Sequence, residues 1–348
     1  MSSHHDRASG SPATASDVSA ADDPLSDVLE TVRLRGALFF QWQPFWPFAS
    51  GVPSDRLFGS LILPGAERIV SYHIVTQGPC WGSVAGERPV RLESGDILLV
   101  PHGDAYVMSS EPRQSSPEDE APTIEFFRLM AAGELPPLVV EGGPGPVHNR
   151  IICGFLGCDV RPYNPVLSAL PRMIHLPARA PGTRDPLSQL IDFALVESGQ
   201  GREGGRCVLL RLSELMFVEV IRRYLVSAPQ PQCGWLAGLR DPLVGRALSL
   251  LHRRPAFPWT LQTLAREAGT SRSTLAEHFT RLVGEPPMQY HTRWRMQVAA
   301  HRLAAGSSKV YGVAQEVGYQ SEAAFSRAFK RVVGMSPAQW RQARAGED

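Results

Sequence analysis

The chain has 348 residues, 43% of them hydrophobic and 20% charged, so it can form two or three domains with apolar cores. Its five cysteines are an odd number, which argues against a disulfide framework, and no apolar run reaches the roughly 18 residues that would span a bilayer. The N-terminus has no apolar segment after basic residues. We therefore expect no secretory signal, no membrane segment and a cytoplasmic protein.

The formal net charge of +1 is unevenly distributed along the chain. Residues 241–348 hold 15 Lys and Arg against 8 Asp and Glu, a net charge of +7. The remainder holds 20 basic and 26 acidic residues, a net charge of −6. The basic C-terminal part therefore suits a polyanionic partner; the alternative is a basic surface that is only solvated.

In chain order, a polar tail is followed by a β-rich region. Residues 1–23 have almost no large apolar side chains, so we expect them to be disordered. A short helix should follow at 25–29. From residue 36 to 178, short apolar runs alternate with Gly and Pro clusters, which predicts a small β-barrel or sandwich in a domain at 24–180. The polar stretch 111–122 is expected to be a loop.

Two helices are predicted after the barrel, at 186–198 and 206–226, because apolar side chains recur there at i, i+3 and i+4. They either pack on the barrel or form the interface of a homodimer. We favour the dimer, since a helix pair outside a closed barrel needs another apolar surface to cover it. The stretch 227–238 is predicted to be a linker. These elements make a helical dimerisation and linker segment at 181–240, ahead of a domain at 241–348.

The C-terminal domain contains an internal repeat. Residues 261–269 match 310–318 at an offset of 49, and residues 275–284 match 325–334 at an offset of 50. In each copy a short helix ends at a glycine that can adopt the left-handed conformation. A hydroxyl side chain follows that can cap the next helix, either Thr270 or Ser271 in the first copy and Ser321 in the second. Each copy is therefore predicted to be a helix-turn-helix unit.

The second copy resembles the signature of the AraC family of transcription regulators. The resemblance is carried by Gly318-Tyr-Gln-Ser-Glu-Ala-Ala-Phe-Ser-Arg-Ala-Phe-Lys-Arg331 and by Gly334-Met-Ser-Pro337, and it covers about residues 241–342. It implies two recognition helices that enter successive major grooves on one face of DNA, roughly 34 Å apart. It also implies that a long helix at 288–305 joins them.

The outward positions of the two recognition helices are the candidate DNA contacts. Arg327 could form a bidentate pair with guanine, and Glu277 or Glu322 could accept a hydrogen bond from cytosine N4. Arg281, Lys330 and Arg331 are expected to contact phosphates. Alternatively, any one of these side chains is exposed and touches nothing. The predicted DNA-binding residues are Arg272, Ser273, Glu277, Arg281, Glu322, Ser326, Arg327, Lys330 and Arg331.

The N-terminal domain resembles the cupin-type ligand domain of one subgroup of AraC regulators. Its run Gly95-Asp-Ile-Leu-Leu-Val-Pro-His-Gly103 is similar to the second cupin motif, and the segments 72–75, 80–81, 153–154 and 164–171 add to the resemblance. Metal-binding cupins place a His three residues after that second glycine, whereas this chain has Tyr106, and the His-x-His of the first motif is absent. We therefore expect neither a complete metal site nor cupin enzyme chemistry.

Four residues are candidates for sensing: His73, Cys80, His102 and Cys153. A His beside Cys80 would lower the thiol pKa and make the sulfur reactive. Alternatively, His73, Cys80 and His102, with Cys153 as a fourth ligand, could hold zinc or copper. A third interpretation is that the cysteines are small buried hydrophobes. The aromatic cluster at 39–48 could line a ligand pocket or fill the barrel, and we favour filling.

The sequence thus predicts an α+β multidomain protein: a cupin-like barrel, a helical segment and an all-α double helix-turn-helix domain. We expect a regulator, not an enzyme, that binds promoter DNA as a homodimer and recruits or blocks RNA polymerase. Its signal would be a redox change at Cys80 or a small organic effector, and only in the first case would mutation of Cys80 abolish the response. The rival interpretation is a cupin metalloenzyme with an autoregulatory DNA-binding domain, which a stoichiometric catalytic metal would support.

Overall fold

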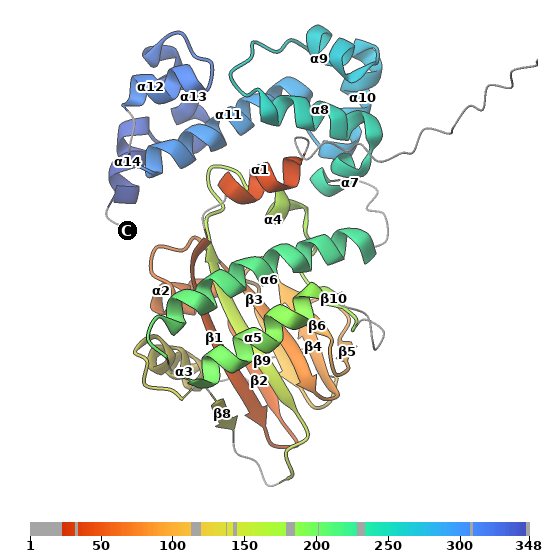
Figure 1. Ribbon diagram of the computed structural model, residues 1–348, viewed down its shortest axis with the longest axis vertical. Coiled ribbons are helices and arrows are strands. Elements are labelled where there is room, and N and C mark those ends of the chain that lie inside the picture. The colour runs from red at the N-terminus through yellow and green to blue at the C-terminus, as the bar shows by residue number, and fades with distance from the viewer. Residues whose placement is uncertain are drawn as a thin grey trace, which may run out of the picture.

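The structure is a computed structural model that describes residues 23–31, 34–112, 120–136, 138–141, 145–178, 185–200, 202–227, 234–306 and 309–345. A β-rich part and a helical part lie one above the other (Figure 1). Apart from Asp23, the tail predicted to be disordered lies outside the described residues. So do residues 228–233 of the predicted linker.

Two sheets form the barrel and confirm the predicted β region. The larger sheet has the strand order β10-β6-β3-β9-β1-β8, and the smaller has the order β2-β7-β4-β5. The strands are β1 Leu34–Pro44, β2 Ala49–Val52, β3 Arg68–Gln77, β4 Cys80–Val84, β5 Val90–Leu92, β6 Ile97–Val100, β7 Tyr106–Ser109, β8 Leu138–Glu141, β9 Arg150–Cys158 and β10 Ile174–Leu176.

Strand β3 separates two apolar cores. Successive side chains of a strand point to opposite faces of its sheet. Ile69 and Val75 join the core inside the barrel, whereas Val70 and Ile74 join a core on the outer face of the larger sheet. Because both faces are covered, the strand is buried from Ile69 to Val75.

Three helices interrupt the β region. The helices are α2 Asp55–Ile62, α3 Ala121–Ala131 and α4 Pro165–Ala169. Neither α2 nor α3 follows from our sequence analysis, yet they pack on each other and insert Phe58 and Phe127 into the barrel core. Helix α3 begins at the end of the predicted loop 111–122, of which residues 113–119 lie outside the described residues.

The two predicted helices after the barrel are confirmed as α5 Pro186–Gln200 and α6 Gly205–Ser227. They lie side by side across the outer face of the larger sheet (Figure 1). Helix α6 buries Leu212, Met216, Val220 and Ile221 in the outer core. Of the two roles that the sequence allows for this pair, the structure shows packing on the barrel.

The helical part contains the two predicted helix-turn-helix units. The helices are α7 Trp235–Arg240, α8 Pro242–Arg253, α9 Leu261–Ala268, α10 Arg272–Val283, α11 Pro287–Ala304, α12 Val310–Glu316, α13 Glu322–Val333 and α14 Pro337–Ala345. Ser271 caps α10 and Ser321 caps α13, and Gly269 ends α9 in the left-handed conformation, as predicted. Helix α11 is the predicted connector.

Helix α7 is a difference from the sequence interpretation, which placed a linker over most of it. It packs on α8 and α10, and Trp235 is buried with its Nε1 donating to the Tyr290 hydroxyl at 2.8 Å. The structural unit that holds the first recognition helix therefore begins at residue 235 rather than 241.

The barrel and the first helix-turn-helix unit share one continuous core. Helix α1 Pro24–Thr31, which confirms the predicted short helix, contacts both α4 of the barrel part and α8 of the helical part. The outer-core cluster extends from β3 through α6 to Leu264 and Phe279. The second unit has a separate core of its own around Phe325 and Phe329. The first unit is thus fused to the barrel, and the second is not.

Candidate DNA-binding surface and sensor cavity

The recognition helices α10 and α13 are each anchored by two aromatic or aliphatic side chains. Leu275 and Phe279 on α10, and Phe325 and Phe329 on α13, are fully buried. Because these pairs face the cores, the opposite faces of α10 and α13 point outward. The two helices belong to units at the two ends of α11 (Figure 1).

All nine predicted DNA contacts lie on these two helices. Eight are exposed and Ser326 is half-buried. Within the described part of the chain, no ion pair engages the charged side chains among them: Arg272, Glu277, Arg281, Glu322, Arg327, Lys330 and Arg331. These charges are therefore available to an external partner.

Of the four sensor candidates, His73 and Cys153 meet inside the barrel. They are paired across β3 and β9, with His73 Nδ1 3.1 Å from Cys153 Sγ. The other ring nitrogen, Nε2, lies 2.6 Å from the hydroxyl of Tyr106. Burial lowers the pKa of His73 to about 3, so the ring is neutral near pH 7. The same cause raises the pKa of the Cys153 thiol well above its usual value.

Cys80 and His102 lie apart from that pair. Cys80 begins β4 in the smaller sheet and is fully buried, and burial raises its thiol pKa to about 12. His102 precedes β7, and its Nε2 pairs with the Leu170 carbonyl at 2.9 Å. Among the residues that the structure describes, no group of three or more His, Cys, Asp or Glu could hold a metal ion. Of the zinc or copper ligands considered from the sequence, His73 and Cys153 pair with each other, His102 pairs with a backbone carbonyl, and Cys80 lies in the other sheet.

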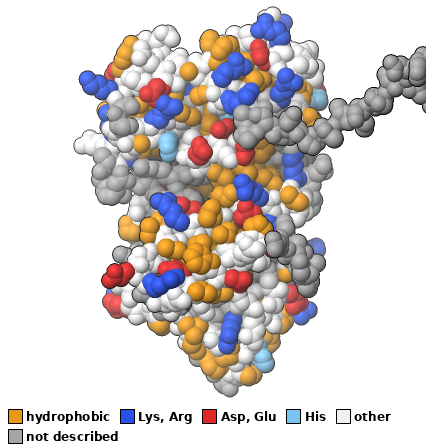
Figure 2. Space-filling view, viewed as in Figure 1, with side chains coloured by type: hydrophobic (Ala, Val, Ile, Leu, Met, Phe, Trp, Pro, Cys, Tyr) orange, Lys and Arg blue, Asp and Glu red, His pale blue; other side chains and the backbone are white. Residues whose placement is uncertain are grey.

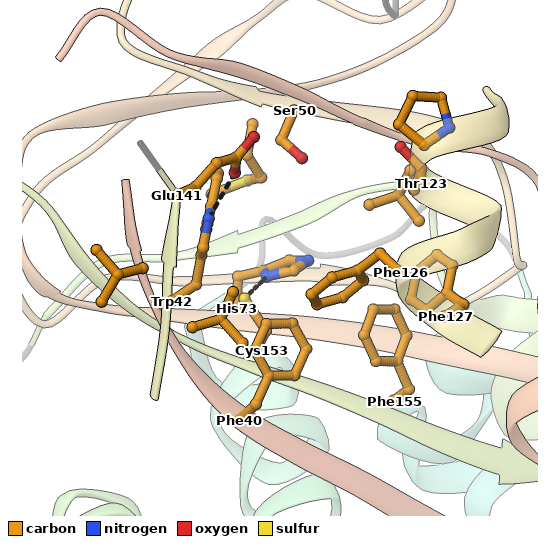
Figure 3. A pocket seen from close by; sticks show the side chains of 15 residues that line it. Phe40, Trp42, Ser50, His73, Thr123, Phe126, Phe127, Glu141, Cys153 and Phe155 are labelled. Carbon is orange, nitrogen blue, oxygen red and sulfur yellow. Dashed lines mark hydrogen bonds between the residues drawn. The ribbon is translucent and has the colours of Figure 1, made fainter. Parts of the chain in front are cut away.

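A cavity of about 270 Å³ opens beside His73 and Cys153. Its walls come from β1, β2, β3, β7, β8, β9 and α3. In Figure 3 the polar side chains of Ser50, Thr123 and Glu141 lie along one edge, and His73 lies between them and the rings of Phe40 and Phe155. The cavity thus has one polar edge and one aromatic wall.

Part of this lining was visible in the sequence. Phe40 and Trp42 belong to the early aromatic cluster, so that cluster does line a pocket and does not only fill the barrel. Phe126, Phe127 and Glu141 come from α3 and β8, and our sequence analysis did not single them out. The signal for α3 in the sequence was the pair Phe126-Phe127 among helix-forming residues. It was missed because it lies next to the polar stretch 111–122, which we interpreted as a loop.

Comparisons with known proteins agree with this geometry. A family model described as cupin matches residues 23–226, and one described as a helix-turn-helix domain matches residues 264–343. A protein of Streptomyces lividans described as an AraC-like transcription regulator is 34% identical over 325 residues, which cover 92% of this chain and 98% of that protein. The chain belongs to the AraC family of transcription regulators. Its full-length relatives are described as regulators, not enzymes, which confirms the preference for a regulator over a cupin metalloenzyme.

More distant likenesses cover one or both parts of this AraC-family chain. The regulator AlkR of Acinetobacter baylyi is 28% identical, over 92% of this chain and 99% of its own. Among solved structures, the DNA-binding domain of AdpA in complex with a target DNA is 31% identical, covers 30% of this chain and 95% of that one, and has a TM-score of 0.29. Fatty-acid-bound ToxT of Vibrio cholerae is 10% identical, covers 89% and 95%, and has a TM-score of 0.32. None of the described helices is long and apolar enough to cross a bilayer.

Proposed function

We propose that this AraC-type regulator reads DNA through the outward faces of α10 and α13. The observation that carries the proposal is a pair of anchored recognition helices joined by the single helix α11. Among the residues that the structure describes, the exposed charges of α10 and α13 named above form no ion pair. Arg327 is the main base-reading side chain, because a guanidinium can bind the O6 and N7 of guanine together. Arg281, Lys330 and Arg331 bind phosphates.

The test is a binding titration on DNA selected by the full chain from a random-sequence pool. Arg327→Ala should weaken binding by about 1–3 kcal/mol and relax the base preference at one position. Lys330→Ala should weaken binding to all sequences alike. The slope of log affinity against log salt should become less steep by about 1, which corresponds to the loss of one phosphate contact. If Arg327→Ala behaves like Lys330→Ala, Arg327 contacts only the backbone.

For the signal, the geometry favours a small ligand in the barrel cavity over a reactive thiol. A thiolate is the nucleophile in redox sensing, and the buried thiols of Cys80 and Cys153 both have raised pKa values. The cavity, by contrast, offers an aromatic wall and a few polar groups, which is the usual make-up of a ligand pocket. Binding there would shift the balance between domain arrangements.

A DNA titration with reduced and mildly oxidised protein separates the two signals. With a small-ligand sensor, oxidation leaves DNA affinity unchanged, and Cys80→Ser responds to ligand as the unchanged chain does. A change on oxidation that Cys80→Ser abolishes would restore the thiol sensor and overturn the ligand proposal.

The outward side of α5 and α6 supports a homodimer. Phe193 and Val196 on α5, and Leu215 and Val226 on α6, are each about half exposed or more. Figure 2 shows hydrophobic side chains gathered on the face that these helices occupy. A second copy would cover this surface, and two copies would place four recognition helices on a promoter, where they recruit or block RNA polymerase.

Sedimentation equilibrium tests the homodimer. The unchanged chain should be a dimer, and the double variant Phe193→Glu with Leu215→Glu should be a monomer. If the unchanged chain is a monomer, the proposed dimer is excluded.

A further inference from the structure

The lining of the barrel cavity points to a class of ligand. We propose that the cavity binds a small hydrophobic organic cation: an amine or quaternary ammonium group that carries an aromatic or alkyl part. The inference rests on the proposal that this cavity is the effector site. Three observations support it: the aromatic rings of the wall, the negative charge at the edge, and the net negative charge of the segment that carries α3 and β8.

Aromatic rings dominate the wall. Phe40 and Phe126 meet edge to face at 5.4 Å between ring centroids, and Phe127 meets Phe155 in the same manner at 5.2 Å. Trp42 adds an indole next to them. The negative faces of such rings attract an ammonium group, with Trp the best of them, and they also cover apolar parts of a ligand.

The charge at the cavity edge is negative. Glu141 on β8 lines the cavity, and its Oε2 accepts a hydrogen bond from Trp42 Nε1 at 2.8 Å. A carboxylate can accept about four hydrogen bonds, so the Trp42 bond leaves capacity for an N–H donor of a ligand. Glu141 and the indole of Trp42 thus form one corner that offers both a carboxylate and an aromatic ring to a cation.

No positive charge balances Glu141 in the described lining. Neither Lys nor Arg is among its residues, and the His73 ring stays neutral because burial lowers its pKa to about 3. An anionic ligand would therefore enter without a partner for its charge, which is costly in a partly enclosed site. Glu141 is exposed at the edge of the cavity, so a cationic ligand can pair with it while its other side stays in solvent.

The segment that supplies α3 and β8 is also acidic. Within 111–141, the residues that the structure describes contain five Glu against one Arg, a net charge of −4. That cation, Arg128, is already paired with Glu125 at 2.7 Å. Net negative charge beside a cavity raises the local concentration of cations. This segment therefore attracts cations to the cavity and repels anions.

Three soluble probes of matched shape test the ligand class. Isothermal titration of the full chain near pH 7 with 3-phenylpropylammonium, 3-phenylpropan-1-ol and 3-phenylpropanoate compares a cation, a neutral molecule and an anion. We expect the cation to bind about tenfold or more tightly than the alcohol, and the anion to bind weakest. Glu141→Gln, which keeps an acceptor for Trp42 Nε1, should remove most of the preference for the cation and leave the alcohol unchanged.

Glu134→Gln is the matched control, because Glu134 is an exposed carboxylate on the same segment that does not line the cavity. It should change the affinity for 3-phenylpropylammonium less than twofold. If the alcohol or the anion binds as tightly as the cation, or if Glu134→Gln has the same effect as Glu141→Gln, the ligand class is wrong while the cavity remains a ligand site. If none of the three probes binds, the cavity proposal itself fails together with the class.

Discussion

At the scale of single residues, burial decides the chemistry of the sensor candidates. His73 shares its ring nitrogens between Cys153 and Tyr106, and the site that a metal-binding cupin gives to a histidine is held by the Tyr106 hydroxyl. A neutral imidazole and a neutral thiol can satisfy each other inside an apolar barrel, whereas an imidazolium and a thiolate would both lose their hydration. His73 and Cys153 therefore line the cavity as neutral groups.

The depressed pKa of His73 predicts a pH dependence of stability. The folded pKa is about 3 and the unfolded pKa is roughly 6.5, so the unfolded chain takes up a proton that the folded chain does not. Stability from this group is present above pH 6.5 and is lost as pH falls toward 3. In urea unfolding between pH 6 and 4, the free energy should fall more steeply for the unchanged chain than for His73→Gln, by up to about 1.4 kcal/mol per pH unit. Equal slopes would show that His73 is charged in the folded state.

At the scale of elements, the two helix-turn-helix units are alike in sequence but not in surroundings. Gly269 and Gly318 occupy equivalent turns and have φ values of +80° and +81°. A Cβ on Gly269 would meet nothing within 4 Å, whereas a Cβ on Gly318 would lie 2.5 Å from the carbonyl oxygen of Ala256. Ala256 lies between α8 and α9, so the turn of the second unit rests on the first unit. This contact helps α11 to set the relative position of α10 and α13.

The two glycines form a matched pair for mutation. Gly269→Ala should cost about 1–2 kcal/mol of unfolding free energy, because an alanine is strained in the left-handed conformation. Gly318→Ala should cost about 1–3 kcal/mol more, because the added methyl also pushes the two units apart. Urea unfolding of both variants measures the difference, and equal losses would show that the contact with Ala256 gives way without cost. Weaker DNA binding by Gly318→Ala is expected as well, since the half-site spacing depends on this contact.

At the scale of the molecule, polar contacts fasten the second unit to the barrel. Arg344 on α14 is buried, and its guanidinium pairs with Asp159 at 3.0 Å and with Glu67. Burial alone would raise the pKa of Glu67, but hydrogen bonds from the backbone of Arg161 and the charge of Arg344 lower it overall. Nearer the centre of α11, Gln297 accepts a hydrogen bond from the backbone of Tyr163 at 3.0 Å. The barrel thus contacts both units, the first through a shared apolar core and the second through charge.

Removing the charge on Arg344 should release the second unit. Arg344→Met leaves buried carboxylates without one of their cations, a loss on the order of 3 kcal/mol. Hydrogen exchange of the α14 amides should then accelerate by on the order of 100-fold. Arg302→Met is the control, because Arg302 pairs with Glu316 on the surface within the second unit, where a pair contributes about 0–1 kcal/mol. Unchanged exchange in Arg344→Met would show that the second unit stays docked without this pair.

The sequence by itself determined those features that depend on neighbouring residues. Left-handed glycines, the caps Ser271 and Ser321, and the repeated apolar spacing specify helix-turn-helix units because each acts within a few residues. Short apolar runs between turns specified the β region for the same reason. The apolar stripe of α6 could be recognised, but the surface it covers could not.

Only the tertiary structure decided which distant residues meet. His73 and Cys153 are 80 residues apart and touch because β3 pairs with β9, whereas Cys80, near His73 in sequence, lies in the other sheet. Arg344 reaches Glu67 across 277 residues. Strand pairing and domain docking depend on the total burial of many segments at once, which no local pattern encodes. The cavity follows from that pairing, because α3 and β8 add walls to those that the early aromatic cluster supplies.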